Sequence, residues 1–354
     1  MKLIGIGDLL IPSRYIEEGF SRYRAKGVDV EVVDWPLKDY EELQSINLQV
    51  ETQGSEVYAV PDALIAKLRD AEILITQFCP ITKKVIDACT KLRFIGVLRG
   101  GYENVNVPYA VQKGITVYHT PGRNATAVAD FTVGMILGEC RNIARAHANL
   151  KEGRWVRDYA NAASVPDLED KTVGIIGLGQ VGQKVAKRLR GFDVRLIGYD
   201  PYVDVLPDDV TRVSFDDLLV QADFVTIHGR LTEETKGLMN ARAFSLMKPT
   251  AYFINTARAG LVDEAALYAA LKEKRIQGAA LDVFEHEKNL IRKDLSGKII
   301  KDAVYRDLAN FPNVIITPHV AFNTDVAVQN MVKMSTENLI NFKNAGTTDN
   351  EITK

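Results

Sequence analysis

Cysteine is scarce in this chain, and a long apolar run is missing. Only three of the 354 residues are cysteine, namely Cys79, Cys89 and Cys140, and their spacing matches neither a CxxC pair nor a zinc site. Buried, reduced thiols are therefore expected, which points to a reducing compartment and a cytoplasmic location. No run of about 18 apolar residues exists that could form a membrane-spanning helix. The apolar stretch at the N-terminus is too short for a signal peptide, so the sequence indicates no membrane partner.

An excess of charge of one sign is also lacking. The 44 basic and 46 acidic residues leave a net charge of -2, which provides no general attraction to nucleic acid or to a membrane surface. No cluster of His, Cys, Asp or Glu has metal-ligand spacing, so no metal is expected. With 46% hydrophobic residues, the chain has the composition and the length of about two globular domains. These properties favour a small molecule as the partner.

What the chain does contain is a glycine-rich turn between a strand and a helix. Residues 171–200, KTVGIIGLGQVGQKVAKRLRGFDVRLIGYD, have the pattern of one βαβ unit, with Gly177, Gly179 and Gly182 at the GxGxxG spacing. The first glycine allows a tight turn, the second lets the backbone approach a pyrophosphate, and the third brings the helix close to the sheet. Such turns also occur for structural reasons alone. The strand, the helix and the following Asp200 together favour a dinucleotide site.

The helix after the turn and the acid after the second strand extend this interpretation. The helix begins with Gln180 and Val181, which we include among the cofactor contacts, and Gly191 stands where its C-cap is expected. Asp200 follows Gly182 by 18 residues, where a carboxylate accepts hydrogen bonds from the adenosine ribose and repels a 2′-phosphate. We therefore predict NAD rather than NADP as the cofactor.

Short apolar runs alternate with amphipathic segments along the chain, which is the pattern of parallel sheets covered by helices. Strands are expected at 3–7, 28–33, 73–76, 94–98, 115–118, 172–176, 194–199, 224–227, 252–255, 277–281 and 314–316. Helices are expected at about 12–26, 63–69, 83–88, 125–152, 240–247 and 264–274, with Ser214 and Asp263 as N-caps. The pattern predicts an α/β fold with two doubly wound parallel-sheet domains, and the long helix from 125 begins the second one.

Four apolar runs end in a polar side chain, namely His228, Arg258, Asp282 and His319. Because parallel strands align their carboxyl ends, these residues are expected on one edge of the sheet, together with the glycine turn. A structural function is also open for them, since a lone histidine at such an edge is as often a hydrogen-bonding partner and Asp282 can simply support a loop. We place His228 in a supporting position near the cofactor and His286 in solvent.

The chemistry of the nicotinamide ring gives these side chains a reaction. The ring exchanges a hydride with a carbon that bears oxygen, so the oxygen must gain or lose a proton at the same time. His319 has the character of the proton carrier, and Glu287 can orient its ring and favour its protonated form. Arg258 presents a planar guanidinium that can bind a carboxylate and polarise the adjacent carbonyl. These three residues predict a 2-oxo acid as the substrate.

A second ligand loop is expected in the first half of the chain. Arg99, Gly100 and Gly101 follow an expected strand at its carboxyl end, where paired glycines expose backbone N–H groups to an anion. A plain turn explains the same pattern equally well. The segment is therefore a candidate substrate-binding loop.

Several motifs, in order, resemble the D-isomer-specific 2-hydroxyacid dehydrogenases. The resemblance spans nearly the whole chain and is carried by IGLGQVGQKVAKRL, HGRLTEETKGLMN, FINTARAGLVDEAAL, AALDVFEHE and NVIITPHVAF. It implies that Arg258, Glu287 and His319 are the catalytic residues of an NAD-dependent dehydrogenase. Thr256 and Ala257, which precede the arginine in the same motif, join Asp282 and His228 among the expected cofactor contacts.

The resemblance also implies a domain organisation and an assembly. It predicts a Rossmann NAD-binding domain, residues 124–321, inserted in a flavodoxin-like substrate domain made of residues 1–123 and 322–354. The chain is expected to cross back after the catalytic histidine, so that a helix from 325 to about 343 completes the substrate domain. Members of this family are usually dimers joined through their nucleotide domains, and a homodimer is expected.

The two halves of the chain disagree about the substrate. The segment between Glu287 and His319 is similar to D-lactate dehydrogenases, whereas GGYENVNVPYAVQKGI and HTPGRNATAVADFTVG look like phosphoglycerate or glycerate dehydrogenases. Phe322 is expected to line the substrate site. Arg99 stands where the family commonly has a small residue, and we hypothesise that it recognises a second anionic group on the substrate. Arg230 also departs from the family pattern and is a candidate contact for a cofactor phosphate.

A second interpretation belongs to another class of protein. The C-terminal-binding-protein corepressors resemble the same family and keep its catalytic residues, so an NAD(H)-binding regulatory protein without significant turnover is the alternative. The sequence lacks the extended disordered or basic tails expected for nuclear work. The leading interpretation is therefore an enzyme.

Overall fold

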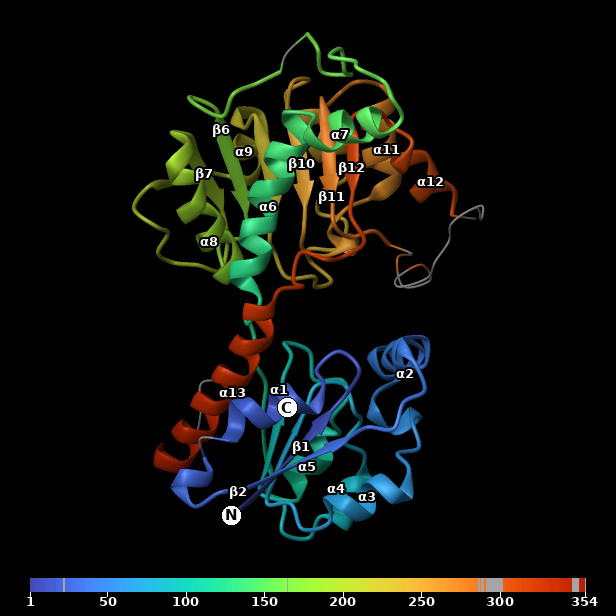
Figure 1. The fold of residues 1–354 in the computed structure, drawn as a ribbon. Coiled ribbons are helices and arrows are strands. Elements are labelled where there is room, and N and C mark those ends of the chain that lie inside the picture. Colours follow the sequence, from blue (N-terminus) through green and yellow to red (C-terminus); the bar gives the residue numbers. More distant parts are fainter. Residues whose placement is uncertain are drawn as a thin grey trace. The chain divides into compact units, whose positions relative to one another are not determined.

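The computed structural model describes residues 1–21, 23–163, 165–285, 287, 290, 302–345 and 350–353. Contacts divide the chain into two compact units (Figure 1): unit 1 consists of Met1–Asn124 and Thr324–Lys354, and unit 2 of Ala125–Asn323. His286 and residues 288–289 and 291–301, on which part of the D-lactate resemblance depends, lie outside the described residues.

The sheet of unit 1 has the strand order β13-β5-β4-β3-β1-β2, and its pairs are parallel except for β13 against β5. Its strands are β1 (Lys2–Gly7), β2 (Asp29–Asp34), β3 (Ile73–Thr76), β4 (Phe94–Val97), β5 (Thr116–Tyr118) and β13 (Glu351–Ile352). Its helices are α1 (Ser13–Ser21), α2 (Tyr40–Gln53), α3 (Asp62–Leu68), α4 (Lys83–Ala88), α5 (Val107–Gln112) and α13 (Asp325–Ala345), with 3-10 turns η1 (Arg24–Lys26) and η2 (Ser55–Val57). The parallel order 2-1-3-4-5 is that of flavodoxin-like folds, with the direction of winding reversing between β1 and β3.

Helix α13 from the end of the chain packs onto the elements of unit 1 formed at its beginning. The phenol of Tyr118 on β5 donates to the Ser335 carbonyl at 3.1 Å, and the Tyr23 phenol donates to the Thr336 carbonyl at 3.0 Å. Helix α1 approaches α13 so closely that a Cβ added to Gly19 would lie 2.0 Å from a side-chain carbon of Val332. The N-terminal and C-terminal segments therefore share one hydrophobic core.

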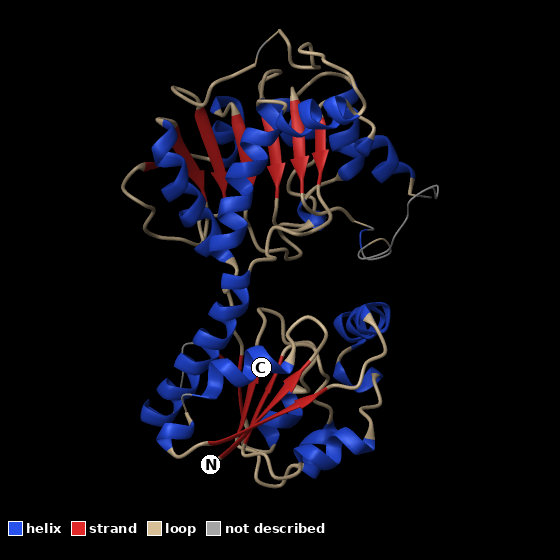
Figure 2. Cartoon of the chain, viewed as in Figure 1, coloured by secondary structure: helices blue, strands red, loops and turns tan. Residues whose placement is uncertain are grey.

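The sheet of unit 2 has the order β12-β11-β10-β9-β6-β7-β8, and all of its pairs are parallel. Its strands are β6 (Thr172–Ile176), β7 (Arg195–Tyr199), β8 (Val210–Arg212), β9 (Phe224–Ile227), β10 (Tyr252–Asn255), β11 (Gly278–Leu281) and β12 (Val314–Ile316). Its helices, which cover the sheet in Figure 2, are α6 (Ala125–Cys140), α7 (Ile143–Lys151), α8 (Gln180–Leu189), α9 (Phe215–Gln221), α10 (Ala241–Leu246), α11 (Glu264–Lys272) and α12 (Ala303–Ala309), with η3 (Arg190–Phe192) and η4 (Ala259–Leu261). This is the Rossmann order, reversing between β6 and β9, and the predicted fold class is confirmed.

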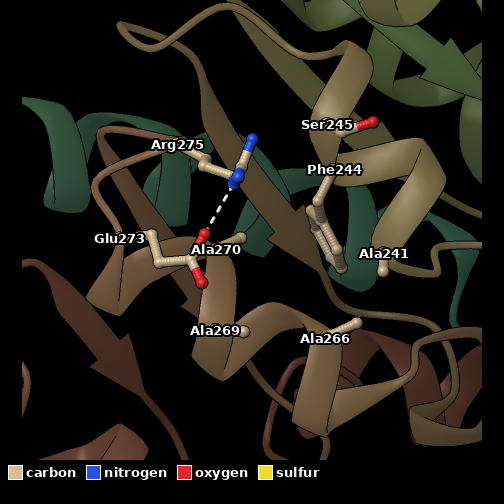
Figure 3. Close-up of a pocket in the computed structure, with 8 residues that line it drawn as sticks. All are labelled: Ala241, Phe244, Ser245, Ala266, Ala269, Ala270, Glu273 and Arg275. Atoms are coloured by element: carbon tan, nitrogen blue, oxygen red, sulfur yellow. Dashed lines mark hydrogen bonds and ion pairs between the residues drawn. The ribbon is translucent and has the colours of Figure 1, made fainter.

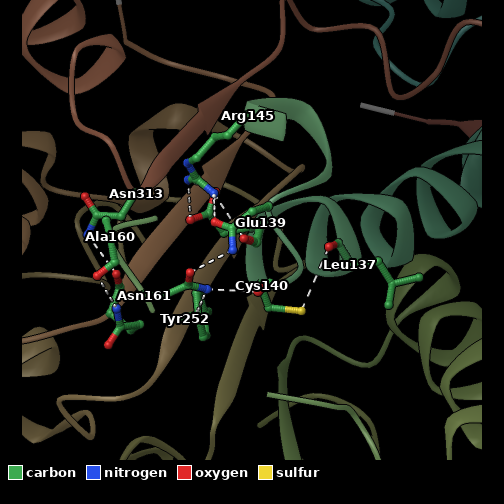
Figure 4. Close-up of polar contacts among 10 residues, drawn as sticks. Leu137, Glu139, Cys140, Arg145, Ala160, Asn161, Tyr252 and Asn313 are labelled. Carbon is green, nitrogen blue, oxygen red and sulfur yellow. Dashed lines mark hydrogen bonds and ion pairs between the residues drawn. The ribbon is translucent and has the colours of Figure 1, made fainter. Parts of the chain in front are cut away.

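The single helix expected from 125 to about 152 is wrong, because α6 and α7 are separate helices. Asn142 between them adopts a left-handed conformation with φ 58°. Figure 4 shows the ion pair beside this break, in which Arg145 donates to both carboxylate oxygens of Glu139 at 2.6 Å. The Asn142 Nδ2 also donates to Asn161 Oδ1, at 2.7 Å. Glu139 is 1% exposed, and burial raises the pKa of its carboxyl to about 7.

Some helix ends follow the expected signals and others do not. Ser214 and Asp263 are N-caps as predicted, and accept from backbone N–H groups at 3.1 Å and 3.0 Å. Gly191 is not the C-cap of α8, because the helix runs into the 3-10 turn η3 and the left-handed residue is Asp193, with φ 54°. The helix expected at 12–26 is also shorter, since α1 ends at Ser21.

Candidate active site

The glycine turn lies between β6 and α8 and is shaped by close contacts. Gly177 has φ +87°, and a Cβ there would lie 2.6 Å from the backbone nitrogen of Gly229, which follows β9. A Cβ on Gly182 would lie 2.1 Å from the carbonyl oxygen of Gly177. Gly179, the N-cap of α8, has no atom within 4 Å of an added Cβ. The first and third glycines are therefore required by packing, whereas the second leaves the helix N-terminus open to a pyrophosphate.

Asp200 follows β7 at the same edge of the sheet and is 8% exposed. Its Oδ2 accepts from the Leu178 N–H at 2.7 Å, and its Oδ1 accepts from the N–H groups of Tyr202 at 2.8 Å and Val203 at 3.2 Å. These bonds tie the glycine turn to the loop after β7. Because a carboxylate has about four acceptor positions, Asp200 retains capacity for a ribose hydroxyl. Gln180 and Val181 lie in the first turn of α8.

Glu287 and His319 meet, as the sequence predicts. Nδ1 of His319, after β12, lies 2.7 Å from Oε1 of Glu287, and the two side chains are 29% and 14% exposed. Oε2 of Glu287 accepts from the Phe284 N–H at 3.1 Å, which fixes the carboxylate. The Phe322 ring lies edge-on to the His319 ring, with 5.7 Å between centroids. The histidine is thus oriented on one side and partly open on the other.

Asp282, after β11, holds the loop that carries His319. It is fully buried, and its carboxylate accepts from Thr317 Oγ1 at 2.6 Å and from the N–H groups of Val320 at 3.0 Å and Ala321 at 2.9 Å. His319 has φ 54°, a conformation that few side chains other than Asn, Asp and His adopt. Asp282 therefore supports the loop, which is one of the two functions that the sequence left open for it.

Arg258 stands on a loop that a buried asparagine organises. Asn255, the last residue of β10 and 1% exposed, accepts from the Ala257 N–H at 3.0 Å and donates to the Arg258 carbonyl at 3.0 Å. The Thr256 hydroxyl bonds to that of Thr132 on α6 at 2.7 Å. Arg258 itself is exposed, and its guanidinium donates to the Ala257 carbonyl at 2.7 Å. Sequence reasoning missed Asn255, although an amide at the end of the apolar run YFIN was a visible signal.

His228, after β9, is held beside the glycine turn. Its Nε2 lies 3.0 Å from the Thr226 hydroxyl, whereas its buried Nδ1 has no hydrogen-bond partner among the described residues. Burial lowers the pKa of His228 to about 3, so the ring is neutral at physiological pH. The backbone of His228 is also one of the groups against which Gly177 packs. A neutral ring is suited to a hydrogen-bonding position and not to carrying charge.

The candidate substrate loop of unit 1 follows β4. The guanidinium of Arg99 is 11% exposed and donates to Asn47 Oδ1 at 2.9 Å, Glu51 Oε1 at 3.0 Å and Glu103 Oε2 at 3.3 Å. His119 Nδ1 lies 2.6 Å from the Gly100 carbonyl, next to Gly101. Arg99 is therefore already matched by carboxylates of unit 1, and its recognition of a substrate anion stays a prediction.

A cavity of about 270 Å³ lies away from these residues, between α10 and α11 (Figure 3). It is lined by Ala241, Phe244, Ser245, Ala266, Ala269, Ala270, Glu273 and Arg275. None of the residues predicted to bind cofactor or substrate is among them. In the part of the chain that the structure describes, no helix combines the length and apolar character needed to cross a bilayer.

Comparison with known families decides the classification. A model of the D-isomer specific 2-hydroxyacid dehydrogenase NAD binding domain matches residues 133–321, which fall within unit 2. The chain belongs to the D-isomer-specific 2-hydroxyacid dehydrogenase family. The family assignment confirms the predicted class, an NAD-dependent oxidoreductase, and gives the corepressor alternative no support.

Three similar proteins illustrate the range of this dehydrogenase family. A D-3-phosphoglycerate dehydrogenase of Methanocaldococcus jannaschii is 38% identical over 75% of this chain, which spans only 48% of that relative. A glyoxylate reductase of Thermofilum pendens is 38% identical over 79% of this chain and 80% of its own length. A solved D-lactate dehydrogenase from Sporolactobacillus sp. has a TM-score of 0.79 at 29% identity, over 100% of this chain and 99% of its own. The chain thus spans about half of one relative and most of the others.

Proposed function

We propose that this chain catalyses the reversible transfer of a hydride between NAD(H) and C2 of a 2-oxo or D-2-hydroxy acid. The observation that carries the proposal is the 2.7 Å contact between His319 Nδ1 and Glu287 Oε1, after β12 of the same parallel sheet whose β6 leads into the glycine turn. When bound, NADH supplies the hydride that reduces C2. The side chains of the protein bind and orient the substrate and exchange a proton with it.

His319 is the proton carrier in this proposal. Because its Nδ1–H donates to Glu287, Nε2 is the ring atom left to exchange a proton with the substrate oxygen. As C2 is reduced, the Nε2 proton moves to the carbonyl oxygen, and in the oxidation direction Nε2 takes the hydroxyl proton. Asp282 supports this step by accepting from the Thr317 hydroxyl before the histidine and from the Val320 and Ala321 N–H groups after it.

Arg258 binds the substrate. Its guanidinium has no ion pair within the described ranges of the chain, so its donors are available to a carboxylate. A planar guanidinium grips a carboxylate through two parallel hydrogen bonds and polarises the neighbouring C2 carbonyl. The Asn255 amide fixes the backbone from which Arg258 projects. In unit 1, we assign substrate binding to the loop with Gly100 and Gly101.

We assign the cofactor to the carboxyl edge of the unit 2 sheet around the switch point between β6 and β9. The pyrophosphate fits the open helix N-terminus at Gly179, and the adenosine ribose fits Asp200. The proposed contacts are Gly177, Gly179, Gln180, Val181, Gly182, Asp200, His228, Thr256, Ala257 and Asp282.

The substrate is a small 2-oxo acid in this proposal. The names of the similar proteins cover D-3-phosphoglycerate, glyoxylate and D-lactate, which share the 2-oxo or 2-hydroxy carboxylate and differ beyond it. His319 and Arg258 act on that shared group. The part that differs has to be recognised by other side chains.

We also propose a homodimer formed through unit 2, in the cytoplasm. Trp155, after α7, is 87% exposed, and Ile143, Leu150 and Val156 nearby in the sequence are exposed as well. Exposed apolar side chains are more frequent at protein interfaces, and these four come from one short stretch of unit 2. The free, buried thiols of Cys79, Cys89 and Cys140 fit a reducing compartment. Sedimentation should give a dimer for the natural chain and a monomer for Trp155→Glu; a monomeric natural chain would contradict the dimer.

The experiment for the reaction follows the hydride itself. The purified chain is supplied with NADH that carries deuterium at both C4 positions and with glyoxylate, pyruvate or hydroxypyruvate. The proposal expects deuterium at C2 of the product and, for the chiral products, the D configuration. Reduction without transfer of deuterium, or tight NADH binding with no reduction of any 2-oxo acid, would contradict it.

A further inference from the structure

Two buried hydroxyl groups of unit 2 meet beside the loop that carries Arg258. Thr132 lies in the middle of α6, and Thr256 directly follows β10. They are 0% and 6% exposed, and their Oγ1 atoms are 2.7 Å apart. The reaction described above uses Thr256 as a cofactor contact and gives Thr132 no function. Either oxygen can be the donor in this contact, so a second hydrogen bond has to decide its direction.

The direction follows from the other contact of Thr132. Its Oγ1 lies 2.7 Å from the Val128 carbonyl oxygen, one helical turn earlier, and donates to it. A carbonyl oxygen only accepts hydrogen bonds, and a threonine hydroxyl has a single proton. Because the proton of Thr132 is committed to Val128, its oxygen can only accept from Thr256. The Thr256 hydroxyl is therefore the donor in the contact between the two threonines.

This direction determines what Thr256 can offer to a ligand. Its proton points to Thr132, so the lone pairs of its Oγ1 remain, and no described residue donates to them. The loop around it is fixed, because Asn255 accepts from the Ala257 N–H and donates to the Arg258 carbonyl, both at 3.0 Å. Thr256 thus presents an acceptor at a fixed position. Such an oxygen can bind an N–H or O–H group but not a phosphate oxygen, which only accepts.

The order of the strands indicates which part of the cofactor reaches Thr256. In the order β10-β9-β6-β7, the proposed ribose site at Asp200 follows β7, the pyrophosphate site follows β6, and β10 lies on the opposite side of β6 from β7. Arg258, which binds the substrate, comes two residues after Thr256, and the nicotinamide ring has to reach that substrate for hydride transfer. The nicotinamide half is therefore expected at Thr256. Its hydrogen-bond donors are the carboxamide N–H groups and the ribose hydroxyls.

We propose that Thr132 is a positioning residue for cofactor binding, which orients the Thr256 hydroxyl so that its oxygen accepts a hydrogen bond from the nicotinamide half of NAD(H). This inference rests on the proposed function, because it concerns the cofactor of the same reaction. It extends the cofactor site from the loops at the carboxyl edge of the sheet into helix α6, which contains none of the cofactor contacts assigned above.

The first test removes the Thr132 hydroxyl and measures NADH binding by isothermal titration calorimetry. Thr132→Val keeps nearly the same shape but cannot accept the proton of Thr256, so Kd for NADH should rise about 5- to 10-fold, as for the loss of one net hydrogen bond. Thr132→Ser keeps the hydroxyl and should bind NADH within about twofold of the natural chain. Equal Kd values for the two variants would overturn the proposal. Failure of the natural chain to bind NADH would overturn the proposed function itself.

A double variant tests whether Thr132 acts through Thr256. Thr256→Val alone removes the acceptor and should weaken NADH binding by a similar factor. Adding Thr132→Val to it should cause no further loss, because the group that Thr132 orients is already absent. Two losses that multiply would mean that Thr132 affects NADH independently of Thr256, and would overturn the proposal.

A cofactor analogue identifies the group that donates to Thr256. The reduced acetylpyridine analogue of NADH has a methyl ketone in place of the carboxamide and therefore lacks the carboxamide N–H groups. A loss of affinity in Thr132→Val that is confined to NADH assigns the donor to the carboxamide. An equal loss for NADH and the analogue assigns it to a ribose hydroxyl. Either result supports the orientation of Thr256 by Thr132.

Thr52→Val on α2 is the matched control. The Thr52 hydroxyl also donates to a carbonyl one turn earlier, that of Leu48 at 2.9 Å, but it lies on an exposed face of unit 1. Its Kd for NADH should equal that of the natural chain. Thermal unfolding without cofactor checks that each variant is folded. A lower stability of Thr132→Val with an unchanged Kd for NADH would limit Thr132 to a structural function and overturn the proposal.

Discussion

The carboxyl edges of the two sheets differ in how fully the protein satisfies their buried carboxylates and amides. In unit 2, both carboxylate oxygens of Asp200, Asp282 and Glu287 take part in hydrogen bonds of 2.6 to 3.2 Å. In unit 1, Asp8 and Gln77 each keep a buried oxygen without a donor. His228 of unit 2 also has a buried ring nitrogen without a partner among the described residues, so the contrast concerns carboxylates and amides and not every buried polar atom. A buried carboxylate whose donors do not offset its burial has a raised pKa, as Asp8 does.

The largest expected effect is a loss of kcat when the proton carrier of unit 2 is replaced. His319→Gln removes the group that exchanges the proton while keeping a hydrogen-bonding side chain for Glu287. We expect kcat for 2-oxo acid reduction to fall by about 10²–10⁴-fold, the range found for a lost general acid or base. Steady-state kinetics give this value, and fluorescence titration should show NADH affinity within a factor of two. Retention of more than a tenth of kcat would remove His319 from the reaction.

The next effect concerns Asp8 and pH. Its pKa is about 6 in the folded protein against an ordinary value of 3.8. Between these pH values the folded state holds a proton on Asp8 that the unfolded state has lost. The contribution of this proton to the free energy of unfolding is therefore fully present below about pH 4 and is lost as the pH rises through about 6. The loss amounts to roughly 3 kcal/mol. Asp8→Asn cannot titrate. Urea unfolding at pH 4 to 7 should therefore show the natural chain losing stability relative to the variant; parallel profiles would contradict the burial of this carboxyl.

A smaller effect is expected on stability, and it should differ between Gly182 and Gly179 of the turn in unit 2. Gly182→Ala places a Cβ 2.1 Å from the Gly177 carbonyl oxygen, so we expect a loss of about 1–3 kcal/mol in the free energy of unfolding. Gly179→Ala meets no protein atom within 4 Å, and is expected to weaken NADH binding with little change in stability. Thermal unfolding and NADH titration of both variants measure this contrast. The same loss of stability in both would show that the turn is not packed as described.

The smallest effect concerns the choice between NAD and NADP. Asp200→Asn keeps the shape of the side chain but removes the negative charge that disfavours a 2′-phosphate. We expect the preference for NADH over NADPH, measured as the ratio of kcat/KM values, to fall by about tenfold, which corresponds to about 1.4 kcal/mol. An unchanged ratio would move the discrimination to another residue, of which Arg230 is the first to test.

The same comparison explains what the sequence can predict. The glycine turn, Asp200 and the meeting of Glu287 with His319 were all predictable, because their spacing along one parallel sheet determines where they lie. The alternation of apolar runs and amphipathic segments predicts parallel sheets covered by helices, whereas the order of the strands comes from the structure. Features that depend on strand ends and local periodicity are therefore accessible before a structure is known.

Other features depend on contacts between distant segments and were missed. The break between α6 and α7 needs the left-handed Asn142 and the Arg145–Glu139 pair, neither of which disturbs the helical pattern. The unpaired oxygens of Asp8 and Gln77 arise from burial at the junction of β1 and β3. Local spacing contains no information about which polar atoms lose their solvent when such strands come together.

The most direct test of the proposed reaction compares the natural chain with the His319→Gln variant, using NADH that carries deuterium at both C4 positions and glyoxylate, pyruvate or hydroxypyruvate. The measurement is the rate at which deuterium appears at C2 of the product, together with the affinity for NADH. We predict transfer of deuterium to C2 by the natural chain and a rate about 10²–10⁴-fold lower in the variant, with NADH affinity within a factor of two. Equal rates in the two proteins, or reduction without deuterium at C2, would contradict the function assigned to His319.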